Sequence, residues 1–117
     1  MNIEDLRDYC LSLPNTTEGL PFDETTLVFK VCNKMFALTN LEGDLFVNLK
    51  CVPEKALELR EEFSSVIPGY HMNKKHWNTV KLDGSIDDSR IKEWINDSYN
   101  LVFASLPKKL REELKTK

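Results

Sequence analysis

Three short segments between residues 25 and 50 alternate apolar and polar side chains and are separated by turns of only a few residues. Leu27, Phe29 and Val31 take every second position in the first, and residues 35–39 and 45–50 continue the pattern. Such alternation predicts β-strands with one apolar face. The connecting turns are too short for anything except antiparallel pairing. An antiparallel meander is therefore expected, and helices are the simplest cover for its apolar face.

The segment before the meander is predicted to be an amphipathic helix over residues 2–13. Leu6 and Cys10 recur at helical spacing. Asn2 is a preferred residue at a helix N-cap, and Asp5 follows three residues later. Proline at position 14 ends the helix, and residues 16–24 are predicted to form a loop.

Three more helices and one more strand are predicted after the meander. The helices cover residues 53–63, the stretch from Asp87 or Asp88 to 105, and a short basic stretch after Pro107. The strand covers residues 77–82, with Trp77 and Asn78 on opposite sides. Because strands and helices do not alternate regularly, the predicted class is α+β, an antiparallel sheet covered by helices. All of residues 1–117 are expected to form a single domain.

The composition restricts the compartment and the partners. The acidic start resembles no secretory signal, and no apolar run is long enough to cross a bilayer. Three cysteines, Cys10, Cys32 and Cys51, are an odd number without framework spacing, which favours free thiols in the cytoplasm. We expect a cytoplasmic protein that is a monomer rather than an obligate oligomer and has no membrane partner.

Charge is spread unevenly along the chain, whose formal net charge is −3. The first 24 residues carry six acidic side chains against Arg7 alone. Lysine and arginine outnumber acidic residues in 64–86 and again in 106–117. Overall acidity argues against strong non-specific nucleic-acid binding, while the uneven distribution allows a local basic face.

The stretch from residue 68 to residue 80 is the richest in chemically capable side chains. It holds both histidines, one of the two tryptophans and an adjacent lysine pair. Cations and amides can contact phosphates, and aromatic rings can stack on bases. We therefore selected as candidate DNA- or ligand-binding residues Lys50, Tyr70, His71, Asn73, Lys74, Lys75, His76, Trp77, Asn78, Lys108 and Lys109. The structural alternative is a loop whose aromatic residues close the core and whose lysines are merely solvated.

These residues also carry a family resemblance. The stretch 68–80 is similar to a motif of the MmcQ/YjbR family, and so are residues 27–31, 34–38, 47–51, 98–102 and 106–110. The resemblance implies a bacterial cytoplasmic protein with a CyaY-like (frataxin-like) two-layer fold, and a DNA-binding role through a wing-like surface. Family members often have Pro-Phe-Gly where this chain has Pro21-Phe22-Asp23. That difference concerns the loop after the first helix and not the main motif.

Other functions remain open on the sequence. The same His, Trp and Lys side chains, with Asn48, could form a small-molecule or protein-binding site without catalysis. The frataxin-like fold suggests iron binding at Glu4, Asp5 and Asp8, although such helices are more often simply solvated. Zinc-type spacing, a nucleophile signature and a phosphate-cradling glycine loop are missing from the sequence. We therefore expect no catalysis, no cofactor and no structural metal.

Overall fold

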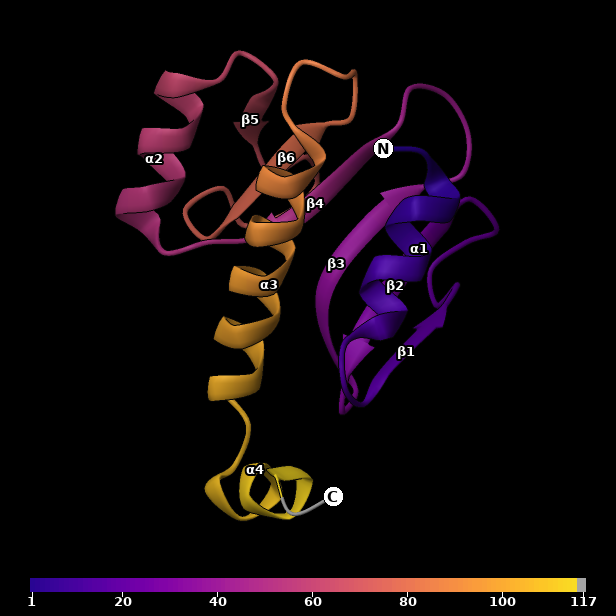
Figure 1. Ribbon diagram of the computed structural model, residues 1–117, viewed down its shortest axis with the longest axis vertical. Coiled ribbons are helices and arrows are strands. Elements are labelled where there is room, and N and C mark those ends of the chain that lie inside the picture. Colours follow the sequence, from indigo (N-terminus) through magenta and orange to yellow (C-terminus); the bar gives the residue numbers. More distant parts are fainter. Residues whose placement is uncertain (116–117) are drawn as a thin grey trace.

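The computed structural model describes residues 1–115 as one six-stranded antiparallel sheet with helices packed on it (Figure 1). The strand order is β1-β2-β3-β4-β6-β5. The elements are α1 (Ile3–Ser12), β1 (Thr16–Gly19), β2 (Thr26–Val31), β3 (Lys34–Asn40), β4 (Phe46–Lys50), α2 (Pro53–Glu62), β5 (Val66–Pro68), β6 (Trp77–Lys81), α3 (Asp88–Ala104) and α4 (Lys108–Lys115). The predicted α+β class and the antiparallel sheet are confirmed.

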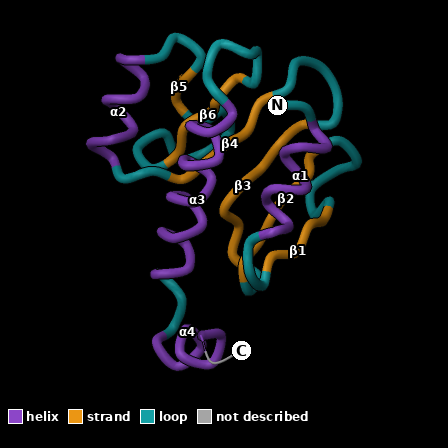
Figure 2. Tube along the Cα trace, in the orientation of Figure 1, coloured by secondary structure: helices purple, strands orange, loops and turns teal. Residues whose placement is uncertain are grey.

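One face of the sheet, called here the helix face, packs against α1, α2 and α3. Phe29, Val47 and Val80 point to this face, and all three are buried in the main hydrophobic core. From α3, the residues Ile91 and Ile95 complete that core. Figures 1 and 2 show α1 lying across the β1–β3 half and α3 across the middle of the sheet.

The helix boundaries follow from local chemistry. Asn2 and Asp5 form a reciprocal capping box, in which each side chain accepts a hydrogen bond from the other residue's backbone N–H. Pro53 occupies the first turn of α2, where its missing N–H costs nothing. Both helix starts therefore agree with the sequence prediction.

Two strands were not predicted. Residues 16–19 were expected in a loop and instead form β1, which pairs with β2 and is tied to α1 by an ion pair between Arg7 and Glu18. Residues 66–68 form β5, which pairs with β6 over three residues. Neither segment has the length or the alternation of an ordinary strand, so tertiary pairing rather than local preference decides their structure.

A buried hydroxyl on α3 joins the helix to the middle of the sheet. Ser98 Oγ donates to the carbonyl of Phe36 at 2.6 Å and accepts the backbone N–H of Lys50 at 2.8 Å. On β3, the residues paired with β4 run from Ala37 to Thr39. The Ser98 hydroxyl therefore bonds two backbone groups, the Phe36 carbonyl and the Lys50 N–H, that lie just outside the paired region. The end of β4, and with it Lys50, is held in place by α3.

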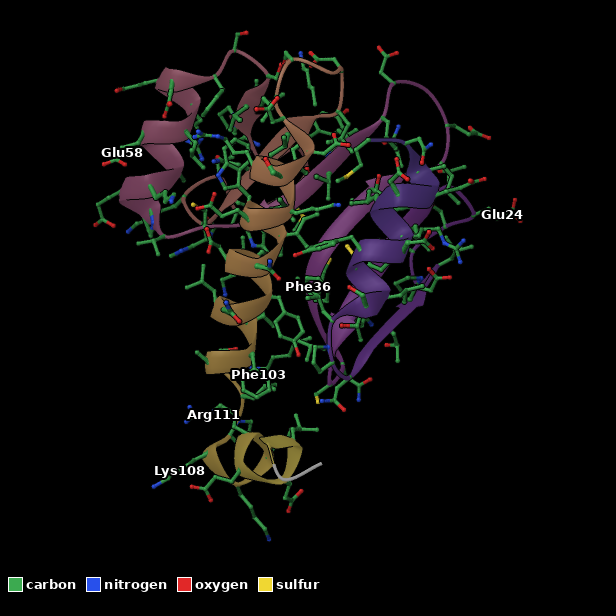
Figure 3. The ribbon with its side chains drawn as sticks, viewed as in Figure 1. Glu24, Phe36, Glu58, Phe103, Lys108 and Arg111 are labelled. Carbon is green, nitrogen blue, oxygen red and sulfur yellow. The ribbon has the colours of Figure 1, made fainter. Side chains whose placement is uncertain are left out.

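The last helix, α4, lies beyond the C-terminal end of α3 (Figure 3). Its labelled residues Lys108 and Arg111 are at the bottom of the view, far along the long axis from β5 and β6, which lie at the top. Within residues 1–115, no helix is long and apolar enough to span a membrane.

Candidate functional site

The β5–β6 loop, residues 69–76, presents most of the candidate side chains to solvent. Exposed positions are taken by Tyr70, His71, Asn73, Lys74 and Lys75. His76 and Trp77 at its end are half-buried. Gly69 N–H donates to the carbonyl of Trp77, which closes the loop at its base. The loop is therefore held in a defined conformation by backbone hydrogen bonds at its base.

Arg60 on α2 anchors the far side of this loop. Its Nε donates to Asn78 Oδ1 at 2.7 Å, and its guanidinium also donates to the carbonyls of Lys74 and, at 3.3 Å, Trp77. A charged residue of a helix as rich in glutamate as α2 would be expected in solvent, but Arg60 is half-buried. One arginine thus fixes the backbone beneath the lysine pair.

The near side of the loop is anchored on the opposite face of the sheet. Thr79 Oγ1 accepts the backbone N–H of Tyr70 at 2.8 Å and donates to Asn48 Oδ1 at 2.5 Å. Asn48 Nδ2 donates in turn to the carbonyl of Tyr70 at 3.2 Å. Both polar side chains are buried, and their hydrogen bonds go to the backbone of Tyr70 and to each other. Together they hold Tyr70 over the sheet.

Two backbone features shape the first residues of the loop. A Cβ added to Gly69 would lie 2.8 Å from Trp77 Cβ, so only glycine fits there. His71 has a φ of 58°, the left-handed region that a histidine adopts more often than most residues. In this conformation its ring lies 4.1 Å from that of Tyr70, centroid to centroid.

The sheet face opposite the helices, called here the open face, carries a short row of paired side chains. Residues directly opposite in an antiparallel pair share a face. On β4 and β6 the pairs are Lys50 with Trp77, Asn48 with Thr79, and Phe46 with Lys81. We call these six residues, together with Tyr70 above them, the β4–β6 platform. At each end of the platform an aromatic ring lies beside a lysine.

A pocket of about 460 Å³ opens at one end of the platform. Its lining mixes aromatic, aliphatic and charged side chains: Asp44, Leu45, Phe46, Ile67, Tyr70, Thr79, Lys81, Leu82 and Asp83. Hydrogen bonds from Ser85, reinforced by one from Ser65, lower the pKa of Asp83 to about 2, so its carboxylate is charged at neutral pH. The pocket therefore offers ring faces, one ammonium and two carboxylates.

The structure corrects one of the predicted site residues and separates two others. Asn78 was expected to be exposed, but it points to the helix face, is 2% exposed, and bonds Arg60 and the carbonyl of Ala56. Lys108 and Lys109 are exposed on α4, away from the loop, and do not extend its basic surface. The other candidates, which are Lys50, residues 70–71 and residues 73–77, lie on or beside the platform.

The acidic first helix does not adjoin this surface. α1 covers the helix face, so the sheet lies between Glu4, Asp5 and Asp8 and the platform. In residues 1–115, no group of three or more His, Cys, Asp or Glu side chains is arranged to hold a metal ion. The carboxylate of Asp5 is already used in the capping box.

The three cysteines are free thiols. Burial raises the pKa of Cys51, which disfavours the thiolate that nucleophilic chemistry needs. Burial also raises the pKa of Cys10 to about 12. Neither thiol is activated.

Comparison with known proteins identifies the family. A family model named YjbR matches residues 11–101. This chain belongs to the YjbR family. The uncharacterized protein YjbR of Escherichia coli K12 is 37% identical over 115 residues, 97% of this chain and 98% of the relative. The uncharacterized protein YbdF of E. coli O157:H7 is 40% identical over 107 residues, 91% of this chain and 88% of YbdF.

Two solved structures share the fold of this chain. The crystal structure of Deinococcus radiodurans protein DR2400, a DUF419 domain, matches with a TM-score of 0.93 and 44% identity, over 97% of this chain and 88% of that one. A crystal structure from Pseudomonas syringae matches with a TM-score of 0.77 and 30% identity, over 87% and 99% of the two chains. The family resemblance read from the motifs is thereby confirmed.

Three residues of the site were missed by the sequence analysis. Arg60 looked like one more charge on a solvated helix, and nothing in its local spacing marks it as an anchor. Phe46 and Lys81 could have been found, because strand alternation and the pairing of residues 45–50 with 77–82 would place them opposite each other.

Proposed function

We propose that this YjbR-family domain binds DNA, through the β5–β6 loop and the adjoining β4–β6 platform. The observation that carries the proposal is the row of lysines and aromatic rings on a sheet face that no helix covers. Lys74 and Lys75 are exposed at the loop, and Lys50 and Lys81 lie on the platform. Lysines supply the phosphate contacts, and rings supply the base contacts.

The arrangement supports binding without chemistry. Within residues 1–115, the ammonium groups of Lys50, Lys75 and Lys81 have no recorded hydrogen-bond or ion-pair partner, so they are available to a ligand. The polar groups with the best geometry, Asn48 and Thr79, are occupied by the loop backbone. We propose a binding protein and no catalytic role.

Fluorescence anisotropy with labelled DNA at 50 mM and 200 mM salt tests the proposal. Three to four phosphate contacts predict an affinity loss of roughly 20- to 150-fold between these conditions. The double variant Lys74→Glu, Lys75→Glu should weaken binding by about tenfold or more at 50 mM salt, because it reverses two contacts. No binding of any DNA at 50 mM salt would refute the proposal.

The C-terminal lysines provide the matched control. Lys108→Glu with Lys109→Glu makes the same charge change on α4, which lies apart from the loop. Both double variants are compared at 200 mM salt as well, where screening confines charge effects to less than about 8 Å. This control should change affinity by less than about twofold, and an effect equal to that of the loop variant would contradict the location of the site.

A second candidate function, small-molecule binding at the same surface, is favoured by the pocket beside Phe46 and Tyr70. A ligand held mainly by rings and aliphatic side chains would stabilise the fold with little dependence on salt. A thermal shift with a metabolite that is unchanged at 200 mM salt and lost in Tyr70→Ala would support this function over DNA binding.

A further inference from the structure

Three aromatic rings follow one another along the platform. Phe46 and Trp77 belong to its two end pairs, and Tyr70 is held above the middle pair by Asn48 and Thr79. Tyr70 is 59% exposed, and the other two rings are half-buried. Phe46 and Lys50 are four residues apart on β4, so the platform is about 13 Å long. Successive rings at this spacing form a stacking surface for unpaired bases.

The pocket at the Phe46 end favours a base over a phosphate. Its two carboxylates, Asp44 and Asp83, outnumber its one ammonium, that of Lys81, so a phosphate group placed there would meet net repulsion. The same oxygens accept hydrogen bonds, which suits the amino and imino groups on a base edge. The rings of Phe46 and Tyr70 line the same pocket and supply apolar walls. Only a base that has left its helical stack can enter.

One platform lysine lines this pocket, and the other lies at the far end of the platform. Lys81 pairs with Phe46 across the strands at one end of the platform, and Lys50 pairs with Trp77 at the other. Each lysine thus lies beside a ring, which is the arrangement a backbone needs when its bases stack on the rings. In duplex DNA the bases are paired and stacked, and the platform rings could not reach them.

From this geometry we infer that the ligand of the platform is single-stranded DNA, with one base in the Phe46–Tyr70 pocket and neighbouring bases on Tyr70 and Trp77. The inference rests on the proposed DNA-binding function and specifies its substrate. The backbone runs past Lys81 and Lys50, and Lys74 and Lys75 contact phosphates beyond the loop.

The test compares a labelled 12-nucleotide single strand with a 12-base-pair hairpin duplex at 50 mM salt. The single strand should bind at least tenfold more tightly. Tyr70→Ala and Phe46→Leu should each weaken single-strand binding by about 5- to 150-fold, the range for losing one stacked base. Leucine keeps apolar volume at the half-buried position 46, so a loss there reports the ring and not the fold.

Phe22→Ala is the matched control. Phe22 is an aromatic residue that is 69% exposed, in the connection between β1 and β2, at the other edge of the sheet. Its removal should change affinity by less than about twofold. Quenching of Trp77 fluorescence by the single strand is a second measurement, and Trp77→Phe should abolish this quenching while keeping most of the affinity.

The outcomes separate the two proposals. If neither DNA form binds, the proposed function fails. If the duplex binds as tightly as the single strand, and Tyr70→Ala and Phe46→Leu have no effect, DNA binding stands and the single-strand inference is overturned. An RNA strand of the same sequence that binds tenfold more tightly than DNA would overturn the assignment to DNA.

Discussion

The β5–β6 loop can close as it does only if residue 69 has no side chain. Gly69→Ala would place a methyl carbon 2.8 Å from Trp77 Cβ and 2.9 Å from the Trp77 carbonyl oxygen. The backbone of the loop would have to shift, and we expect a loss of about 1–3 kcal/mol in the free energy of unfolding. Urea denaturation measures it. Gly19→Ala, where an added Cβ meets nothing within 4 Å, should change stability by less than about 0.5 kcal/mol.

The lowered pKa of Asp83 predicts that its contribution to the stability of the fold depends on pH. Its pKa is about 2 in the folded protein because Ser85 and Ser65 donate to it, and about 3.9 in an unfolded chain. A lowered folded pKa contributes stability that is present above about pH 4 and is lost as pH falls toward 2. The difference in urea midpoint between the wild type and Asp83→Asn should therefore be largest at neutral pH and vanish near pH 2.

Asn78 shows where residue-level prediction succeeded and failed. Strand alternation already placed Asn78 on the side of Val80, and that side is the buried helix face. Its selection as an exposed candidate rested on residue type rather than on this alternation. His71, Lys74 and Lys75 were correctly expected to be exposed, because a glycine turn and adjacent lysines are typical of a surface loop.

Among the elements, α2 is coupled to the β5–β6 loop through Arg60. Arg60→Met would remove hydrogen bonds to Asn78 and to the carbonyls of Lys74 and Trp77, leaving the buried amide of Asn78 without its charged partner. We expect about 1.5–3 kcal/mol of destabilisation by urea denaturation. Faster hydrogen exchange in residues 69–76 should accompany it, because the loop loses its anchor.

Lys55→Met is the control for this variant. It removes the same charge from an exposed position on the same helix. If Lys55→Met destabilised the protein as much as Arg60→Met, the effect would come from the charge of α2 and not from the hydrogen bonds to the loop.

Long, periodic elements were predictable and short ones were not. The meander and the helices α1, α2 and α3 were found within a few residues of their bounds, because each buries one face at a clear period. β1 and β5 have four and three residues and owe their structure to the neighbouring strand. The anchoring role of Arg60 belongs to the same class, since it depends on where α2 packs.

For the whole molecule, the single core predicts one cooperative unfolding transition. Trp94 belongs to α3 and is buried in the core on the helix face, whereas Trp77 lies on the open face, so the two tryptophans report on both sides of the sheet. Urea transitions followed by far-UV circular dichroism and by fluorescence should coincide in the wild type and in Trp77→Phe. Transitions with different midpoints would contradict the single-domain prediction.

The arrangement of charge in space is the part that the sequence could not supply. Basic residues in 64–86 and in 106–117 suggested one extended surface, yet α3 carries α4 away from the loop. The acidic residues of α1, in contrast, belong to a helix on the helix face, so the sheet separates them from the platform. Both results depend on how the helices cross the sheet, which has no local signature.

The two edges of the sheet limit how this protein can meet its neighbours. β5 has three residues and ends at Pro68, which has no amide hydrogen to offer another strand. β1, at the other edge, has four residues. Short edges of this kind discourage the strand-to-strand stacking that leads to fibrils. The sheet can therefore leave one face without a covering helix and still not become a template for aggregation.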